Sequence, residues 1–580
     1  MSDSKEKNNN NNNNNDNNAS DNNAGSGSLE KVKSIFRSPG MAAVWKWSKC
    51  VRVKVVMICV ITVIATVVSL CFTLATKGLV DGAVSANSEN LVKYALILFG
   101  IILAQHLLSA SRAWFRVRAS AELQQSLQGM LVREILSKEY PGLKKYHSGE
   151  LVNRVFSDMS VIKNGIMNIL PSLIGIVVSF VGAAGILIAM DWHFVILMLV
   201  GGILGLVLVI LFRGPMKARH KRMQEAEGAL HASIQETFGN IRLIKSSLSE
   251  ERQIRKIGTD QDYLSQEQVR QGIFSFRMND SMGLVFDLSW LFCMLWGCVS
   301  IYRGNLTYGA LAAMLQLIGR IQSPIANSVN IASQLYSVSS SAERLLELTD
   351  LPAEEEGERL TTFDEIILDN VTFQYDDGID EVLQKVNWTI RRGDFMALTG
   401  ISGGGKTSLF QLLLGIYKPT EGEILFRIGD REITASRGTR ALFAYVPQGN
   451  TLFSGTLRDN LTMFTDSATE EEIREAVEAA CLSSVLDEIG YDAVLGERGV
   501  GLSEGQAQRV AVARALLSKA PILLLDEATA ALDDKTEAQL LENISKMRDK
   551  TCIIVTHRQA ALGICDYTLH IEDGVVSRKA

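Results

Sequence analysis

The sequence lacks any cysteine pattern that would indicate a redox motif or a metal site. Its eight cysteines include no CxxC pair and show no Cys/His spacing suited to a metal ion. We therefore predict that they are small buried hydrophobic residues: Cys50, Cys59, Cys71, Cys293, Cys298, Cys481, Cys552 and Cys565. The net charge of -6 does not by itself indicate a class of partner, and no nucleic-acid partner is expected.

Apolar residues are almost absent from the first thirty positions. Residues 1–30 form a tract rich in Asn, Ser, Asp and Gly. Such a tract cannot bury enough apolar surface to offset its chain entropy, so we predict a disordered tail. A charged segment followed by a short apolar core and a cleavage site is also lacking, as is an Arg-rich amphipathic presequence. No cleaved targeting signal is expected.

Long apolar runs begin at Val55. The chain is 47% apolar yet 21% charged, a composition that suits a protein divided between lipid and water. A helix needs about 20 apolar residues to cross a bilayer. Six runs meet this condition, near 55–79, 92–112, 165–190, 193–213, 281–302 and 307–323. Only Asp191, Trp192 and His193 separate the third run from the fourth, which predicts a tight hairpin at one membrane face.

The distribution of Lys and Arg predicts the orientation of these helices. Residues 31–54, 112–164 and 213–277 hold seven, nine and twelve Lys or Arg, whereas the loops at 81–90, 191–193 and 303–307 hold only Arg303. Positive residues close to membrane spans stay on the cytoplasmic side. We expect both chain ends to be cytoplasmic and the protein to be a multi-pass component of the cytoplasmic (plasma) membrane.

The two longer basic connections are predicted to be helices that continue beyond the bilayer. Their charged, heptad-like pattern is typical of such extensions. Breaks at Pro141-Gly142 and Gly239-Asn240 would let each pair of extensions turn through a short transverse segment. We expect these turns to contact a cytoplasmic domain. The alternative is a pair of solvated amphipathic arms that transmit nothing.

An acidic linker at 351–362 separates a predicted transmembrane domain, residues 31–350, from a predicted α/β domain at 363–580. In the second domain an apolar strand runs into a glycine-rich loop and then a helix, which is the context of a P-loop. Glycine amides can close around phosphates, Lys406 can reach the β and γ phosphates, and the Thr407 hydroxyl can bind Mg²⁺. The predicted ATP contacts here are Gly400, Ser402, Gly403, Gly404, Gly405, Lys406, Thr407 and Ser408.

A second half of the phosphate site is predicted at 521–527, where four apolar residues lead into two acids. Such a run is typical of a buried parallel strand. Asp526 would hold Mg²⁺, and Glu527 would act as the general base on the attacking water. Either acid alone would be a weak indication, whereas both together with the P-loop predict an ATPase.

The segment Leu502-Ser503-Glu504-Gly505-Gln506 resembles LSGGQ, the signature sequence of the ATP-binding cassette (ABC) transporters. The resemblance covers about residues 45–580 and extends to further motifs. It implies that Tyr375 stacks on adenine, that Gln448 is the Q-loop glutamine that touches Mg²⁺, that Asp533 is the D-loop aspartate, and that His557 senses the γ phosphate. The resemblance also implies that Ser503, Gly505 and Gln506 contact the ATP of a partner subunit.

A transmembrane domain followed by one ATPase domain is similar to the exporter branch of that family, and so is LGERG at 495–499 with Glu497 and Arg498. The resemblance implies a dimer with two ATP molecules and Mg²⁺ between the ATPase domains. A homodimer is our first expectation, and a heterodimer stays open. Two departures are Glu504, which replaces a glycine and which we expect to point away from phosphate, and Ala531, where serine is common.

Polar residues within the spans are the candidates for cargo binding. Asp287 lies in the fifth run, where a central charge costs at least about 2.5 to 3.5 kcal/mol and tends to face protein or water. Gln316 and Arg320 share a face of the sixth run with three amides, Asn327, Asn330 and Gln334. This face would line a hydrated cavity. The alternative is that Asp287 and Arg320 form a structural pair.

The predicted fold is thus an α-helical six-span transmembrane domain followed by an α/β P-loop NTPase domain. The predicted function is ATP-driven export of a peptide, lipid or hydrophobic small molecule by alternating access as a dimer. The alternatives are an importer or lipid flippase of the same fold, and an ATP-gated membrane sensor or regulator that moves nothing.

Overall fold

A computed structural model describes residues 37–579 apart from 192, 377, 379, 402, 450, 466, 497, 498, 500, 548 and 549, and for parts of two long helices, 193–239 and 308–349, it describes only the backbone. The predicted disordered tail, Glu497 and Arg498 lie outside the described residues. The chain divides into two compact units. Unit 1 comprises residues up to 132 and 149–347, and unit 2 comprises 133–148 and 348–580.

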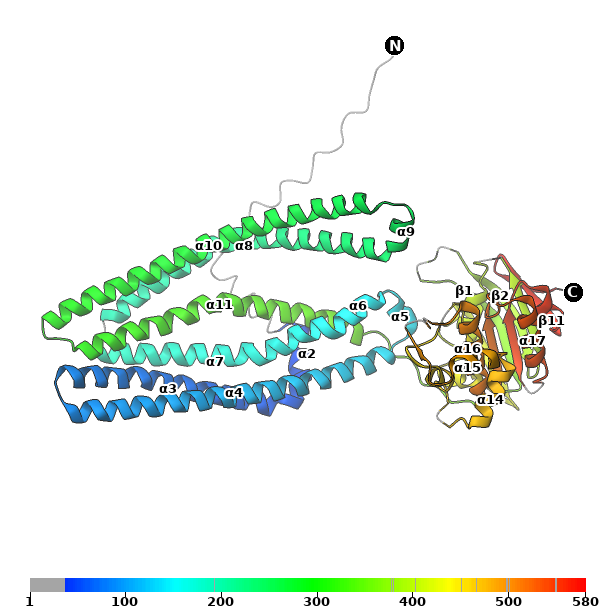
Figure 1. The fold of residues 1–580 in the computed structure, drawn as a ribbon, viewed down its shortest axis with the longest axis horizontal. Coiled ribbons are helices and arrows are strands. Elements are labelled where there is room, and N and C mark those ends of the chain that lie inside the picture. The colour runs from blue at the N-terminus through cyan, green and yellow to red at the C-terminus, as the bar shows by residue number, and fades with distance from the viewer. Residues whose placement is uncertain are drawn as a thin grey trace, which may run out of the picture. The chain divides into compact units, whose positions relative to one another are not determined.

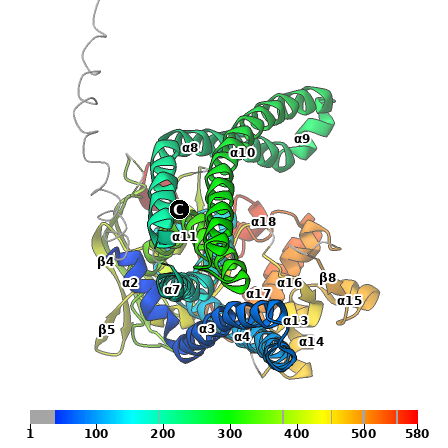
Figure 2. The ribbon, with the colours of Figure 1, turned by 90° about the vertical axis from the view of Figure 1, so that its left-hand side faces the viewer.

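Unit 1 is entirely helical in its described part (Figure 1). Its helices are α2 (Pro39–Trp47), η1 (Ser48–Val51), α3 (Arg52–Val84), α4 (Ser88–Leu136), α6 (Ser148–Asn153), the π-helical turn η2 (Arg154–Asp158), α7 (Met159–Met190), α8 (His193–Gly239), α9 (Ile241–Ser246), α10 (Glu250–Tyr302) and α11 (Tyr308–Thr349). Figures 1 and 2 show α8 and α10 side by side, joined through the short helix α9. The predicted turn at Gly239-Asn240 is therefore present as a short helix between two long ones.

Four helical segments in the described part of the chain are long and apolar enough to cross a membrane. They are Pro39–Val84, Ser88–Leu136, Ser148–Met190 and Glu250–Tyr302. The predicted spans at 193–213 and 307–323 fall within α8 and α11, which are long helices with incompletely described side chains. The helical character of all six runs agrees with the sequence, while the count of six spans stays a prediction. The hairpin between the third and fourth runs is as tight as expected, because α7 ends at Met190 and α8 begins at His193.

The core of unit 1 packs α3, α4, α7 and α11 around leucine, isoleucine and methionine side chains such as Ile58, Leu123 and Ile162, none of which is exposed. Buried charges are paired beside this core. Arg344 on α11 donates to the buried carboxylate of Asp158, and Arg154 donates to Glu347 across 3.0 Å. A buried charge is stable only with a partner. These ion pairs therefore stabilise the contact between the start of α7 and the end of α11.

Unit 2 contains two sheets and the helices that cover them. The strands are β1 (Glu365–Phe373), β2 (Leu383–Arg391), β3 (Phe395–Gly400), β4 (Glu421–Ile428), β5 (Arg431–Thr434), β6 (Phe443–Val446), β7 (Gly455–Thr456), β8 (Val494–Leu495), β9 (Ile522–Asp526), β10 (Thr551–Val555), β11 (Tyr567–Glu572) and β12 (Val575–Lys579). The helices are α5 (Tyr140–Lys144), α12 (Lys406–Leu413), η3 (Gly438–Leu442), α13 (Leu457–Leu461), α14 (Glu470–Ala479), α15 (Ser483–Ile489), α16 (Glu504–Leu517), α17 (Asp534–Ser545) and α18 (Gln559–Leu562).

The larger sheet has the order β12-β11-β3-β10-β9-β6, in which the five strands from β11 to β6 are parallel. Strands β3, β9 and β10 are buried along their whole length, which explains why their sequences are mainly apolar. The smaller sheet, β2-β1-β4-β5, is antiparallel. Because β3, β10, β9 and β6 are neighbours, the loops that leave their carboxyl ends meet at one edge, where ligands bind in such sheets.

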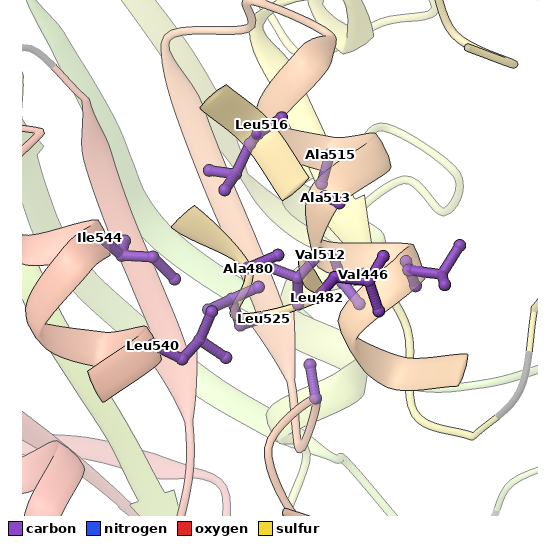
Figure 3. Packing of buried hydrophobic residues seen from close by; sticks show 14 of the residues in the cluster. Val446, Ala480, Leu482, Val512, Ala513, Ala515, Leu516, Leu525, Leu540 and Ile544 are labelled. Atoms are coloured by element: carbon purple, nitrogen blue, oxygen red, sulfur yellow. The ribbon is translucent and has the colours of Figure 1, made fainter. Parts of the chain in front are cut away.

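Two hydrophobic clusters hold unit 2 together, one on each face of the larger sheet. One fills the space beneath α16 and α17 and includes Val512, Leu525 and Leu540 (Figure 3). The other packs α12 against both sheets around Phe410 and Phe426, which are fully buried. The strand ends are thus fixed from both sides.

The prediction that all cysteines are buried is wrong for three of them. Cys50, Cys71 and Cys298 are exposed in the isolated chain, whereas Cys59, Cys293 and Cys552 are buried. Cys71 and Cys298 lie on long apolar helices, where a face turned away from neighbouring helices can be as apolar as the core. An apolar side chain on such a helix face need not be buried within the protein, which is why the prediction failed for these cysteines.

Candidate nucleotide site

The P-loop connects the end of β3 to the start of α12. Gly403 and Gly405 have φ values of +80° and +96°, a region that L side chains rarely adopt. A Cβ at Gly400 would lie 2.3 Å from the carbonyl oxygen of Ile571. These glycines are thus required by the backbone path, which explains their density in the sequence. Ser402, a predicted contact, lies outside the described residues, and Gly404 and Ser408 lie in the loop and the first turn of α12.

Lys406, the first residue of α12, is turned back over the loop. Its Nζ donates to the carbonyl oxygens of Gly400 and Ile401, at 2.8 and 2.7 Å. The side chain is only 6% exposed, so its charge lies in a poorly solvated position. A buried ammonium favours an anionic partner strongly. The loop therefore presents a positive charge and a helix amino terminus in the same place.

Thr407 and Asp526 connect the P-loop to the end of β9. The Thr407 hydroxyl donates to Asp526 Oδ2 at 3.0 Å, and the Tyr445 hydroxyl lies 3.4 Å from the same oxygen. Burial raises the pKa of Asp526 above its usual range, against the opposing effect of the Thr407 hydrogen bond. A nearby divalent cation would offset this cost, because it stabilises the charged form.

These oxygens fit a magnesium ion held mainly by a nucleotide. Mg²⁺ in such sites takes one or two protein oxygens and completes its shell with phosphates and water. A hydroxyl and a carboxylate are the expected protein contribution, and both are here. Across the described residues, no cluster of three or more His, Cys, Asp or Glu side chains could hold a metal ion without such help.

Glu527 follows Asp526 directly and adopts a left-handed backbone with φ +51°. Its amide donates to the carbonyl of Val555 on β10 at 3.2 Å, which fixes the turn. A left-handed non-glycine residue costs roughly 1 to 2 kcal/mol, and such strain occurs often at functional sites. This conformation turns the chain sharply at Glu527, directly after Asp526.

Gln448 meets Glu527 across the sheet edge. Gln448 lies two residues beyond β6, and β6 pairs with β9 in parallel. The side-chain amide Nε2 donates to Glu527 Oε2 at 2.6 Å. The structure thus brings together two residues that are 79 positions apart and that the sequence assigned to one site.

His557 lies on the loop after β10, whose last residue, Val555, is the register partner of Asp526. The loops that carry His557 and Glu527 therefore leave neighbouring strands at the same edge. The histidine is exposed. Asp533 is the N-cap residue of α17, and its carboxylate accepts a hydrogen bond from the amide of Thr536 at 3.0 Å. This hydrogen bond lowers the pKa of Asp533.

The signature segment forms the start of α16. Ser503 and Gln506 make a capping box, in which the Ser503 hydroxyl accepts from the Gln506 amide and the Gln506 side chain accepts from the Ser503 amide. Glu504 is the exposed first residue of the helix. Gly505 lies so close to the D-loop that a Cβ would be 2.8 Å from the carbonyl oxygen of Ala531.

Two residues that the sequence did not single out fix the D-loop. The Gln508 side chain accepts from the amide of Ala531 at 3.1 Å. Arg558, next to His557, donates to the carbonyls of Ala530 and Leu532 and to the buried carboxylate of Glu537, at 2.9, 3.0 and 2.9 Å. Arg558 therefore ties the histidine loop to the D-loop. The one sequence feature that could have identified Arg558 is its position directly after His557, a predicted site residue.

Tyr375, the predicted adenine contact, belongs to an aromatic cluster. Its ring lies edge-on to those of Phe373 and Tyr417, with centroids 4.8 and 5.3 Å away. Its hydroxyl is 2.8 Å from that of Ser408. The ammonium of Lys144, in the transverse helix α5, lies 4.7 Å from the Tyr375 ring centroid. This distance is typical of a cation–π contact.

Further contacts within unit 2 join the residues just before α5 to the ATPase domain, to the linker and to the end of α11. Lys418 pairs with Glu139 at 3.2 Å, the amide of Glu139 donates to Pro352, and the Lys138 side chain reaches the carbonyl of Thr349 at 2.5 Å. The expected contact between the first transverse turn and the ATPase domain is therefore present. The second turn, α9, belongs to unit 1.

The predicted cargo residues are separated in unit 1. Arg320 donates to the Ser69 hydroxyl and lines a cavity between helices. Gln316 is half-buried on α11 and Asp287 is exposed on α10, and neither is among the residues that line this cavity. Arg320 contacts Ser69 and, within the described part of the chain, makes no ion pair with Asp287, so the alternative of a structural pair between them is not observed.

Two family models match the chain. A model described as "ABC transporter transmembrane region" matches residues 55–325, and a model described as "ABC transporter" matches residues 383–530. The two matches follow each other in one chain, and they correspond to the helical part and to the sheet-containing part of the structure.

Relatives with the same arrangement cover most of the chain. It is 26% identical over 505 residues to the probable multidrug resistance ABC transporter ATP-binding/permease protein YheI of Bacillus subtilis, an alignment covering 85% of this chain and 86% of the relative. It is also 26% identical over 533 residues to the ATP-dependent lipid A-core flippase of Syntrophus aciditrophicus, covering 90% and 88%. A solved bacterial Atm1-family ABC exporter with ATP bound shares its fold, with a TM-score of 0.78, 22% identity and coverage of 91% and 94%.

Proposed function

Because this chain belongs to the ABC transporters of the exporter type, in which a transmembrane region is fused to an ATPase domain, we propose that it exports its cargo by alternating access, with Glu527 as the catalytic base. ATP binding and its hydrolysis coupled to transport follow from the family. The observation that carries the catalytic assignment is the 2.6 Å hydrogen bond between Gln448 and Glu527 at the edge where the P-loop also ends.

The roles of the site residues follow from their chemistry. Lys406 and the amides of the glycine loop bind the β and γ phosphates. Thr407 and Asp526, joined across 3.0 Å, would hold Mg²⁺. Gln448 would complete the metal site and orient the attacking water, from which Glu527 takes a proton. His557 binds the γ phosphate from the neighbouring strand end.

The base must exchange partners during the cycle. In this structure the Gln448 amide donates to the Glu527 carboxylate. When a water molecule replaces that amide, Glu527 becomes free to accept a proton from the water. Movement of Gln448 away from Glu527 would therefore switch the base on. This exchange offers a physical link between nucleotide binding and catalysis.

Half-transporters with this exporter fold typically work as dimers, and we assign this chain to a homodimer. Ser503, Gly505 and Gln506 at the start of α16 would face the ATP bound by the partner, because a helix amino terminus favours an anion. Lys406, Gln448, Glu527 and His557 are all present, so each copy carries its own hydrolytic residues. We further propose that the protein lies in the cytoplasmic membrane and that both chain ends are in the cytoplasm.

The experiment that tests the proposal is ATP-dependent accumulation in sealed inside-out proteoliposomes. Carboxyfluorescein and rhodamine 6G serve as probes, with Glu527→Gln as the matched control. Accumulation of either probe that needs ATP and is lost in the control supports export. ATP hydrolysis without accumulation of either probe would favour the alternative of an ATP-gated regulator, and stimulation by cargo from the opposite side would favour an importer.

A further inference from the structure

A cavity of about 710 Å³ lies within unit 1, between α3, α4, α7 and α11. Its walls carry mainly hydroxyls, amides and guanidinium groups, with a few apolar residues between them. The charged and amide residues that line it are Arg112, Arg116, Arg320, Gln105, Asn168 and Gln334. The cavity therefore has three positive side chains, and none of the lining residues that the structure describes is acidic.

Among the residues with described side chains, no carboxylate neutralises the three arginines. Arg320 donates to the Ser69 hydroxyl, a neutral group. Arg112 and Arg116 make no hydrogen bond or ion pair in the described part of the chain, although Arg112 is only half-exposed. By contrast, the buried carboxylate of Asp158 in the same unit is paired with Arg344. Unpaired positive charge among apolar helices is costly, so an anionic occupant would stabilise this arrangement.

The positive groups lie at two levels of the cavity. Arg112 and Arg116 are four residues apart on α4 and so share one helix face. Helices α3 and α4 form a hairpin, and Ser69 and Gln105 are at similar distances in sequence from its turn at 85–87. At 1.5 Å per residue, Arg112 lies about 10 Å further along α4 than the level of Ser69, where Arg320 is bound. The cavity thus has a positive site at each end of a polar space.

We infer that this cavity binds an organic anion as cargo, preferably one with two acidic groups about 10 Å apart. The inference rests on the proposed transport function and specifies its substrate class. Guanidinium groups bind carboxylates or phosphates through paired N–H donors. The serine, asparagine and glutamine side chains between the arginines would accommodate polar parts of the same molecule.

The test measures binding without ATP, so that its failure can be separated from failure of the transport function. The full chain is placed in nanodiscs of zwitterionic lipid. Fluorescence anisotropy is then recorded with carboxyfluorescein, an anion, and rhodamine 6G, a cation with the same xanthene core. Empty nanodiscs give the background for partition into lipid. The expected result is saturable binding of carboxyfluorescein at least tenfold tighter than that of rhodamine 6G.

Variants then locate the site. Arg112→Gln together with Arg116→Gln breaks no contact in the described structure, and we expect it to weaken carboxyfluorescein binding tenfold or more, as does Arg320→Gln. Arg118→Gln is the matched control, because Arg118 lies on the same helix but stacks on Trp114 at 4.8 Å instead of lining the cavity. The Arg118→Gln variant should bind carboxyfluorescein with an affinity within about twofold of that of the unaltered chain.

Three outcomes would overturn the inference. One is equal binding of the anionic and cationic dyes, and a second is the absence of saturable carboxyfluorescein binding. The third is that the Arg112→Gln, Arg116→Gln double variant binds the anion as tightly as the Arg118→Gln control. Because ATP hydrolysis is measured separately on the same nanodiscs, a chain that hydrolyses ATP but fails here refutes the cargo class alone.

Discussion

Removal of Arg558 should loosen the D-loop without touching a nucleotide contact. The guanidinium joins the carbonyls of Ala530 and Leu532 to the carboxylate of Glu537, whose side chain is only 1% exposed. Arg558→Ala would leave that carboxylate buried with one hydroxyl partner, Thr529, at 2.7 Å. The local structure between 529 and 537 therefore loses its main electrostatic support.

The size of this effect can be worked from burial. Removal of one partner from a fully buried ion pair costs about 3 to 5 kcal/mol. The Arg558 side chain is 34% exposed, so solvent screening reduces the value. We expect a local destabilisation of about 2 to 3 kcal/mol, which corresponds to amide exchange about 30 to 150 times faster.

The assay is hydrogen–deuterium exchange with mass spectrometry on the full chain, following the peptide that contains residues 529–537. Glu537→Gln in the Arg558→Ala background should recover part of the protection, because the buried group is then neutral. Arg392→Ala, at an exposed arginine of the same unit, is the control. A change of less than about threefold in Arg558→Ala, or no coupling between Arg558 and Glu537, would refute this reasoning.

Three further predictions concern the nucleotide site. Tyr375→Leu removes the proposed adenine stack, worth roughly 0.5 to 1.5 kcal/mol, and should raise the KM for ATP about 2- to 12-fold with kcat retained; an unchanged KM would contradict the adenine assignment. Lys144→Ala removes a cation that competes for the Tyr375 ring, so ATP titrations should show about 2- to 5-fold tighter binding, and weaker binding would contradict this. Gly505→Ala places a Cβ against the carbonyl of Ala531, and the resulting overpacking of about 1 to 3 kcal/mol should lower ATP hydrolysis at saturating ATP while single-nucleotide binding is retained.

The parts of the site that sequence predicts well are those carried by contiguous residues. The glycine loop with Lys406 and Thr407, and the strand ending in Asp526 and Glu527, each combine a backbone pattern with a chemical group. Their context as strand, loop and helix follows from apolar runs on either side. The structure then adds the distances, such as 3.0 Å between Thr407 and Asp526, which no local pattern contains.

Contacts between distant segments are what the sequence could not supply. Arg558 bonds to carbonyls 26 and 28 positions earlier, so its role depends on the pairing of β9 with β10. In unit 1, Arg112 counted only as a positive residue beside a span, yet it lines the cavity. Gln316 was placed on the same face as Arg320, but it lies about 6 Å nearer the start of α11, beyond the cavity lining.

The most direct test of the account is Mg²⁺-ATP hydrolysis by the purified chain alone in lipid nanodiscs, compared with Glu527→Gln. Loss of the general base should reduce the hydrolysis rate about 10² to 10⁴-fold, while ATP binding is retained because no phosphate contact is removed. That result would establish a self-sufficient chain that uses Glu527 as its base. Hydrolysis that continues at the unaltered rate in Glu527→Gln would contradict the catalytic assignment.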